Sequence, residues 1–295
     1  MVERCQRCNP EFCTYPEHVQ YATVNNKQIL GSKDSLCEGI FHVFPAPEFA
    51  IKEHGSLTGR VHDNCRPYAM TLVAICGELI GRFTNCNRKH AEEFLVSDKR
   101  MYNHVRTFKP KAMVLFMKHH PCHHSSGNAR RYPNGYVFNG QSDLKSCTMQ
   151  MIRYYREVLQ PNGVELWIKV AWLYKAFWKH ATRDDDKQTV ENSLTGLKMM
   201  LEAGIRFLAM EPHDWIILAG MCNEPISLPI LLSPARLTVD NGIKKFLTDL
   251  QDTMKLAQEE DNKQAQHLKR AQPIVVEDED TNTPLVKRVC AAEKN

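Results

Sequence analysis

The sequence predicts a layered α/β domain, because segments with the length and composition of strands alternate with segments of helical periodicity. Such alternation is typical of crossover units, in which a helix connects two strands of the same sheet. The predicted strands cover residues 66–83, 111–119, 164–174 and 205–210. The predicted helices cover residues 89–105, 147–163, 189–204 and 212–222.

Apolar runs define the first half of this pattern. Residues 66–83 (RPYAMTLVAICGELIGRF) are β-branched, apolar and long enough for one or two strands. Residues 89–105 carry their apolar side chains on one helical stripe, and residues 111–119 form a continuous apolar run after a Lys-Pro pair, which favours a buried strand. The stripe consists of Phe94, Leu95, Met101 and Val105.

Glycine and proline divide the second half. Residues 123–146 lose all periodicity and gain Gly, Asn, Ser and Tyr, so we expect a loop there. The helix that follows ends at Pro161 and Gly163, and the helix over residues 189–204 ends with Gly204 as its C-cap. Residues 164–174 alternate between polar and apolar side chains, as a strand does.

The chain divides into four parts. Residues 1–45 are a cysteine-containing N-terminal extension with little periodic apolar content, and residues 46–225 form the core domain. Residues 226–270 contain an amphipathic helix, from Gly242 to about Arg270, which we expect to pack on the core; the alternative is a helix that binds a partner protein. Residues 271–295 are charged and aperiodic, and we expect them to be disordered.

Composition bounds the compartment and the partners. The 295 residues are 43% hydrophobic and carry a net charge of +4, which is compatible with nucleic-acid binding without requiring it. We expect no membrane association, since no run of about 18 apolar residues and no signal peptide is present. The number of cysteines, 11, is odd and their spacing irregular, which favours reduced thiols and a cytoplasmic or nuclear location.

Two short motifs contain the residue types of a catalytic zinc site. His90 precedes Glu92 by two residues at the start of a predicted helix, and Pro121-Cys122 stands at the end of a predicted strand. A catalytic zinc ion needs three protein ligands and one open position for water. We predict that His90, Cys122 and Cys147 are these ligands, because Cys147 opens the next helix as the second cysteine of a compact Pro-Cys-x-x-Cys motif would.

These residues are of the same types and in the same order as those of the signature His-x-Glu…Pro-Cys-x-x-Cys of zinc deaminases that act on nucleobases. In that chemistry the glutamate is not a ligand but the general base and acid. Glu92 would therefore take the proton of the attacking water and deliver it to the base and to the departing ammonia.

The second cysteine is displaced, because 24 residues lie between Cys122 and Cys147. Loop-closure entropy grows with the logarithm of length, so the insertion costs roughly 2 kcal/mol. Zinc binding contributes on the order of 10–16 kcal/mol in small structural sites and outweighs this cost. His123 and His124 remain alternative third ligands, and Ser125 stands where the compact motif has its cysteine.

These motifs resemble those of the AID/APOBEC-type cytidine deaminases of nucleic acids. The resemblance covers residues 66–222 and includes His90-Ala91-Glu92, Pro121-Cys122, Leu173-Tyr174 and the run GLKMMLEAGIRFLAMEPHDW from Gly196 to Trp215. It implies a three-layer α/β/α fold with a five-stranded mixed sheet and zinc between two helices. Two features depart from the family: Lys118-His119-His120 replaces Ser-Trp-Ser before Pro-Cys, and the cysteine motif is split.

Aromatic residues among basic ones suggest a polynucleotide substrate. Tyr174, Phe177 and Trp178 lie in or beside the loop KAFWKHATR, and stacking of aromatic rings on bases suits single-stranded nucleic acid. In the family that it resembles, this loop reads the nucleotide 5′ to the target. The alternative is that Phe177 and Trp178 cap the core.

Four further residues are candidate substrate contacts. Arg130 and Arg131 lie in the inserted loop, which both cysteine ligands anchor, while His119 and Asn64 precede the Pro-Cys pair and the first strand. The resemblance implies cytosine as the target base. The sequence therefore predicts a zinc-dependent cytidine deaminase of single-stranded DNA or RNA, with single-stranded DNA favoured, acting as a mutator or in defence. A deaminase of free cytidine and a non-catalytic nucleic-acid-binding protein with a structural zinc are the alternatives.

A second zinc site in the N-terminal extension is a further hypothesis. Cys5, Cys8 and Cys13 could form it with Cys37 or His18. The alternative is an ordinary segment with reduced thiols.

Overall fold

The computed structural model describes residues 19–23, 28–30, 71–85, 90–123, 146–173, 184–222 and 233–271. Its strands are β1 (Val19–Thr23), β2 (Thr71–Cys76), β3 (Leu79–Thr84), β4 (Ala112–His119), β5 (Glu165–Trp172) and β6 (Arg206–Ala209). Its helices are α4 (Ala91–Val96), α5 (Lys99–Phe108), α6 (Cys147–Tyr154), α7 (Asp184–Glu202), α8 (Pro212–Ala219) and α10 (Pro234–Ala271). A π-helical turn, Tyr155–Leu159, and a 3-10 turn, Gln160–Asn162, follow α6.

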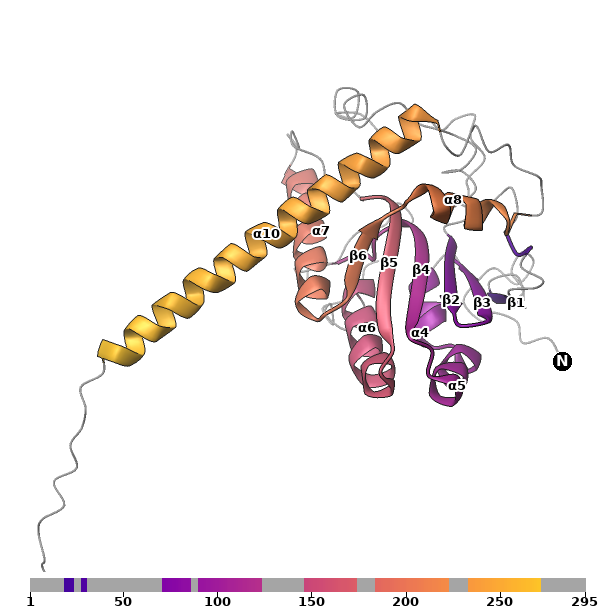
Figure 1. Cartoon of the computed structure of the whole chain (residues 1–295), viewed down its shortest axis with the longest axis horizontal. Helices are drawn as coiled ribbons and strands as arrows, with labels where there is room; N and C mark the ends of the chain where they lie inside the picture. Colours follow the sequence, from indigo (N-terminus) through magenta and orange to yellow (C-terminus); the bar gives the residue numbers. More distant parts are fainter. Residues whose placement is uncertain are drawn as a thin grey trace, which may run out of the picture. The chain divides into compact units, whose positions relative to one another are not determined.

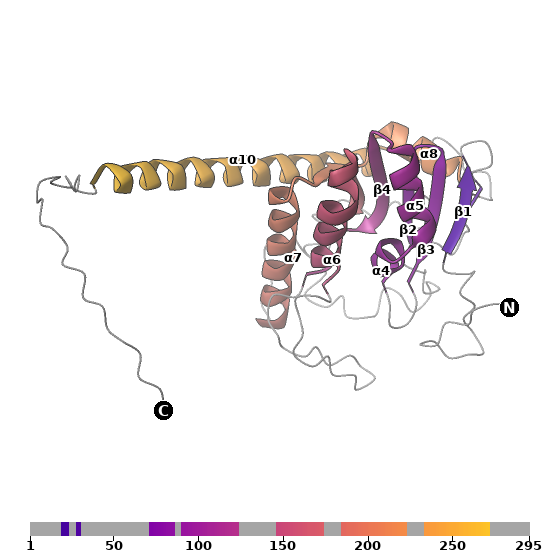
Figure 2. The same cartoon turned by 90° about the horizontal axis from the view of Figure 1, so that it is seen from below.

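One mixed sheet organises these elements. Its order is β1-β3-β2-β4-β5-β6, and Figure 1 shows the strands side by side in this order. The pairs β1/β3, β3/β2 and β2/β4 are antiparallel, whereas β4/β5 and β5/β6 are parallel. The helices α6 and α7 connect the parallel strands, as the alternation in the sequence predicts, and they lie side by side in Figures 1 and 2.

The sheet has six strands rather than the five expected from the resemblance. The additional strand is β1, which comes from a segment assigned to the N-terminal extension. It pairs with β3, and Tyr21 packs edge-on against Phe83 with the ring centroids 6.3 Å apart. The strand has five residues, of which Val19 and Tyr21 pack against one apolar cluster and Ala22 against the other. So short a pattern is too weak to be recognised in the sequence.

Helices cover both faces of the sheet, and the strands alternate between two apolar clusters. Leu72, Leu115 and Ile168 belong to the larger cluster, which includes side chains of α4, α5, α6 and α7. Val73 and Phe116 point to the other face, where the smaller cluster contains Trp215 and Leu218 of α8. Burial on both faces explains why β4 reads as a nearly continuous apolar run. The strand β5 alternates instead, with Leu166, Ile168 and Val170 buried between half-buried residues.

The predicted helix over residues 89–105 is interrupted. It consists of α4 and α5, and Asp98 between them caps α5 by accepting a hydrogen bond from the Met101 backbone N–H at 2.7 Å. Lys109 ends α5 in the left-handed region at φ 44°, immediately before Pro110. The break limits α4 to six residues. His90 and Glu92 lie at its start, and Ala91, Phe94 and Leu95 pack in the core.

The long helix α10 starts earlier than the sequence indicates, at Pro234, and its first half packs in the core. Val239, Ile243 and Leu247 are buried in the larger cluster. The chain comprises two compact units, residues 1–252 and 253–295, and α10 contributes to both. Residues 272–295, for which we predict disorder, lie outside the described residues. Among those described, no helix has the length and apolar character needed to cross a membrane.

Candidate metal centre

Three separate elements bring His90, Cys122 and Cys147 together. His90 immediately precedes α4, and Cys147 is the first residue of α6. Cys122 follows β4 by three residues. Because α6 leads from β4 into the parallel strand β5, it runs back along the sheet, so its first residue lies near the end of β4. In the topology predicted from the sequence, Cys122 and Cys147 therefore lie close together, although 24 residues are inserted between them.

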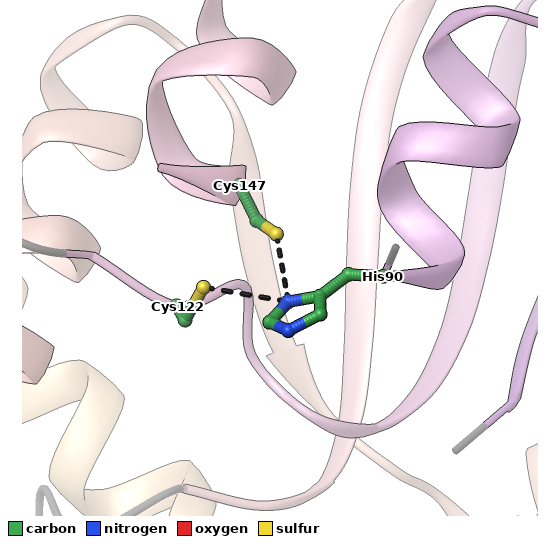
Figure 3. A group of neighbouring side chains, drawn as sticks. All are labelled: His90, Cys122 and Cys147. Atoms are coloured by element: carbon green, nitrogen blue, oxygen red, sulfur yellow. Dashed lines mark hydrogen bonds between the residues drawn. The ribbon is translucent and has the colours of Figure 1, made fainter. Parts of the chain in front are cut away.

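The geometry of the three side chains fits a metal ion. The Nδ1 atom of His90 lies 3.1 Å from the sulfur of Cys147 and 3.6 Å from that of Cys122, and Figure 3 shows both sulfurs directed at this nitrogen. All three ligand atoms lie within 4.8 Å of one another. Tetrahedral zinc would require about 3.6 Å between nitrogen and sulfur and about 3.8 Å between the sulfurs. Small side-chain adjustments would meet both values.

The metal affinity of this cluster depends on pH, because its side chains must lose protons before they can bind a metal ion. A hydrogen bond with Cys122 raises the pKa of His90 to about 9. The pKa of the Cys147 thiol is raised as well, by its hydrogen bond with Cys122 and by burial. A metal ion must displace the protons of these groups, so the affinity for metal is expected to rise with pH.

Glu92 lies in the first turn of α4 with only 7% of its surface exposed. Burial, followed by the negative charge of Cys122, raises the pKa of its carboxyl group to about 7. Such a group exchanges its proton near neutral pH. This is the property required of a general acid and base beside a metal centre.

The neighbouring Glu93 has a different role. Its Oε1 atom accepts a hydrogen bond of 2.9 Å from the backbone N–H of His90 and so fixes the start of α4. Asn85 accepts a second bond there, from the N–H of Ala91 at 2.6 Å. Of the two consecutive glutamates, Glu93 therefore holds the helix end, whereas Glu92 is the buried carboxyl group whose pKa is matched to proton transfer.

Among the alternative third ligands, only His123 belongs to the described residues. It is buried, and its Nδ1 atom forms a hydrogen bond of 3.2 Å with the hydroxyl group of Ser146. His123 is not a member of the His90, Cys122 and Cys147 group, the single potential metal cluster in the described part of the chain. His124 and Ser125 lie outside that part.

His119 ends β4 on the sheet face that also carries Leu115 and Met117, the face covered by α4 and α6. It is half-buried, and burial lowers its pKa to about 3, so its imidazole ring is neutral at physiological pH. A substrate contact by His119 stays a prediction.

The other predicted substrate and metal contacts lie outside the described residues, and their roles stay predictions too. They are Asn64, Arg130, Arg131, Tyr174, Phe177, Trp178, Cys5, Cys8 and Cys13.

Ser146 and Thr148 flank Cys147 and contact the Pro121-Cys122 segment, and neither is predicted as a site residue from the sequence. A signal for Ser146 was present, since a serine immediately before the first residue of a helix is a typical N-cap. The contacts of Thr148 depend on the folded chain and have no local signal.

Replacing Cys147 by alanine is expected to weaken zinc binding by more than about 100-fold, because a ligand contributes more than the outer-shell partners whose loss costs about 10–100-fold. Competition with a chromophoric chelator measures this affinity. Cys222→Ala is the matched control: its thiol is also buried, but it donates to the Leu218 carbonyl in the smaller apolar cluster. Unchanged affinity of Cys147→Ala would assign the third ligand to another residue.

No protein-family model matches this chain, and no curated protein matches it in sequence. The assignment of the site therefore rests on the three converging ligand atoms and on the buried carboxyl group beside them.

Proposed function

We propose that this protein is a zinc-dependent cytidine deaminase of the AID/APOBEC type, which converts cytosine to uracil in single-stranded nucleic acid. The observation that supports this most strongly is the combination of the His90, Cys122 and Cys147 group with the buried Glu92. A structural zinc site needs a fourth protein ligand and no titrating carboxyl group, whereas a catalytic site has three ligands and a general base.

Zinc is the metal that this ligand set favours. One imidazole nitrogen and two thiolate sulfurs suit a borderline-soft ion with tetrahedral preference. When bound, the ion supplies a water molecule whose pKa is lowered toward neutrality.

Glu92 carries the proton transfers in the proposed reaction. Its carboxylate takes a proton from the attacking water, and the oxygen forms a bond to C4 of cytosine. The carboxylic acid then gives this proton to the ring nitrogen N3. A second proton from the same oxygen follows the same route to the amino group, the C4–N bond breaks, and uracil and ammonia leave. A pKa of about 7 makes both directions of transfer accessible at neutral pH.

The choice of a polynucleotide rests on the resemblance and on the residues around the motifs. Phe177 and Trp178 are candidates for stacking on bases, and Arg130 and Arg131 for contacts with phosphates. Single-stranded DNA is favoured over RNA and free cytidine by the resemblance alone.

The decisive experiment incubates the zinc-loaded protein with a single-stranded DNA oligonucleotide that contains one cytosine. Uracil is detected by glycosylase treatment and strand cleavage, with an RNA oligonucleotide and free cytidine as parallel substrates. We expect uracil in the DNA. Turnover of only RNA or cytidine would change the substrate class, and a zinc-loaded protein inactive on all three would identify the zinc as structural.

A further inference from the structure

Hydrogen bonds connect the two cysteine-bearing parts of the metal site, the Pro121-Cys122 segment and the start of α6 at Cys147. In a compact Pro-Cys-x-x-Cys motif, two intervening residues would make this connection. The carbonyl oxygen of Cys122 accepts three of them: from the Thr148 N–H at 3.0 Å, the Thr148 hydroxyl at 3.1 Å and the Ser146 hydroxyl at 3.3 Å. The Thr148 hydroxyl also lies 3.3 Å from the carbonyl oxygen of Pro121. These contacts connect the Pro121-Cys122 segment to the first turn of α6.

The helix α7 closes over this connection. A Cβ atom at Gly196 would lie 2.6 Å from the Cβ atom of His123 and 2.9 Å from the Thr148 hydroxyl oxygen. Only a glycine permits so close an approach. His123 in turn is hydrogen-bonded to Ser146.

The connection is shielded from water. Ser146 and Thr148 have no exposed surface and His123 is only 8% exposed. Buried hydrogen bonds do not exchange readily with water, so they hold backbone positions more firmly than bonds at the surface. The backbone carbonyl of one metal ligand is thus fixed by residues on both sides of the other ligand, Cys147.

We propose that Ser146 and Thr148 are positioning residues that preform the metal site. Their hydroxyl groups hold the Pro121-Cys122 segment against α6, so the two sulfurs are already close before a metal ion binds. Without them, metal binding would also have to close the 24-residue loop between the cysteines. The inference rests on the metal site of the proposed function but needs no catalytic turnover.

The test compares the zinc affinity of Thr148→Val and Thr148→Ser by chelator competition. Valine keeps the shape of threonine and removes the hydroxyl group, so we expect zinc binding about 10–100-fold weaker, as for other outer-shell partners. Serine keeps the hydroxyl group and should retain the affinity. Affinity unchanged in a folded Thr148→Val protein would overturn the proposal.

A second variant covers the case in which Thr148→Val does not fold. Ser146→Gly removes the other hydroxyl group, while glycine still serves as an N-cap for α6. Circular dichroism of the metal-free variant establishes folding, and its zinc affinity should fall in the same way. This test measures zinc affinity and not turnover. If the variants lose affinity as expected but the wild-type protein deaminates nothing, the proposed function is refuted and the positioning role of Ser146 and Thr148 still holds.

A different observation concerns the outer face of α5. The segment from residue 99 to residue 111 contains five exposed basic side chains and no acidic one. They are Lys99, Arg100 and Arg106 of α5 together with Lys109 and Lys111 directly after it, and we call this set the α5 basic face. None of them forms an ion pair with another described residue. The Arg100 guanidinium group lies 4.3 Å from the centre of the Tyr21 ring in β1.

Exposed aromatic rings lie on the same segment. Phe108 is 68% exposed and Tyr102 is 37% exposed, and the ring of His104 lies 4.7 Å from that of Phe108. The Arg106 guanidinium group lies 5.5 Å from the centre of the Tyr102 ring. The helix is held rigidly beneath them, because Met101 and Val105 are completely buried.

We infer that the α5 basic face binds the phosphate backbone of single-stranded nucleic acid, an inference that rests on the substrate class of the proposed function. Cations without an acidic partner, interleaved with accessible rings, are the combination that such strands bind, since phosphates contact the charges and bases stack on the rings. The turn between β2 and β3 carries Glu78, one exposed negative charge against five positive ones. The turn Tyr155–Leu159 also contacts α5, and its exposed Arg156 and Glu157 add no net charge.

The test uses a fluorescent thymidine oligonucleotide, which offers no cytosine and so separates binding from deamination. The variant Arg106→Glu/Lys109→Glu should bind about tenfold or more weakly. Its salt dependence should flatten by about 1.4 in log–log slope, because two phosphate contacts are lost at about 0.7 each. Lys244→Glu/Lys263→Glu, on exposed positions of α10, is the control with the same change in net charge.

Equal loss in both variants, or none in the α5 variant, would overturn the inference. So would binding of an acidic polyglutamate peptide as tightly as the oligonucleotide, because an acidic protein would then be the partner of this face.

Discussion

In the zinc-loaded Glu92→Gln variant, the rate of deamination is expected to fall by on the order of 10³-fold or more. A single general acid-base group contributes about 10²–10⁴-fold to a rate, and Glu92 serves in several proton transfers. Glutamine has nearly the same shape but can neither accept nor release a proton. Uracil formed in the oligonucleotide assay measures the loss, and zinc content should remain that of the wild type because Glu92 is not a ligand.

The adjacent glutamate provides the matched control. Glu93→Gln also replaces a carboxylate by an amide in the first turn of α4. The Glu93 side chain, however, accepts a hydrogen bond from the His90 backbone N–H. We expect Glu93→Gln to retain turnover and to lose at most about 1 kcal/mol of stability, as for a weakened helix cap. Equal losses of activity in both variants would indicate that the helix start, rather than the Glu92 proton, limits the reaction.

The same Glu92→Gln variant has an expected signature without metal. The pKa of Glu92 is raised from 4.5 to about 7 by burial, so the folded state favours the protonated form. The stability that this proton provides is complete below pH 4.5 and is lost as pH rises through 7. Above pH 7, the buried charge of Glu92 lowers the free energy of unfolding by on the order of 3 kcal/mol.

Metal-free Glu92→Gln should therefore be more stable than the wild type at pH 8 and similar to it near pH 4.5. Denaturant unfolding in the presence of a chelator measures this difference. A stability difference that does not change with pH would contradict the burial of an ionisable Glu92. A gain in stability from removing an active-site charge is the usual trade-off between stability and activity.

Much of the fold could be predicted because long periodic segments carry their own signal. The strand expected over residues 111–119 is β4 at Ala112–His119, and the stripe residues Phe94, Leu95, Met101 and Val105 are all buried. Cys147 could be selected over its rivals because it begins a helix, and in a crossover unit that helix returns to the end of the preceding strand.

The features that escaped prediction depend on contacts between distant residues. The strand β1 is recognisable only through its partner β3, and the connection between Thr148 and Cys122 spans the inserted loop. The close approach of Gly196 to His123 likewise exists only in the folded chain. Local periodicity carries no information on such contacts, however long the segments that supply them.

Breaking the buried ion pair at the start of α10 is expected to have the largest effect on stability. Arg236 and Asp240 lie 2.6 Å apart with side-chain exposures of 3% and 5%. Arg236 also donates to the Ala171 carbonyl at 2.9 Å, and the Trp215 indole N–H donates to Asp240 at 2.8 Å. One network thus joins α10 to the end of β5 and to α8.

Arg236→Met should destabilise the protein by about 3–5 kcal/mol, because it leaves the Asp240 carboxylate buried without its cation. Burial raises the pKa of Asp240, and the hydrogen bond and charge of Arg236 oppose that rise. The variant will therefore tend to take up a proton at Asp240, and its instability should be greatest above neutral pH. Denaturant unfolding of the zinc-loaded protein measures the change.

The same helix offers a control with identical spacing. Lys245 and Asp249 are also four residues apart and 2.7 Å from each other, but their side chains are 75% and 60% exposed. Lys245→Met should cost no more than about 0.5 kcal/mol, since solvent screens such pairs. The double variant Arg236→Met/Asp240→Leu should regain most of the stability lost in Arg236→Met, because no buried charge is left unpaired. If it is as unstable as the single variant, the bonds to Ala171 and Trp215, rather than the unpaired carboxylate, hold α10 on the core.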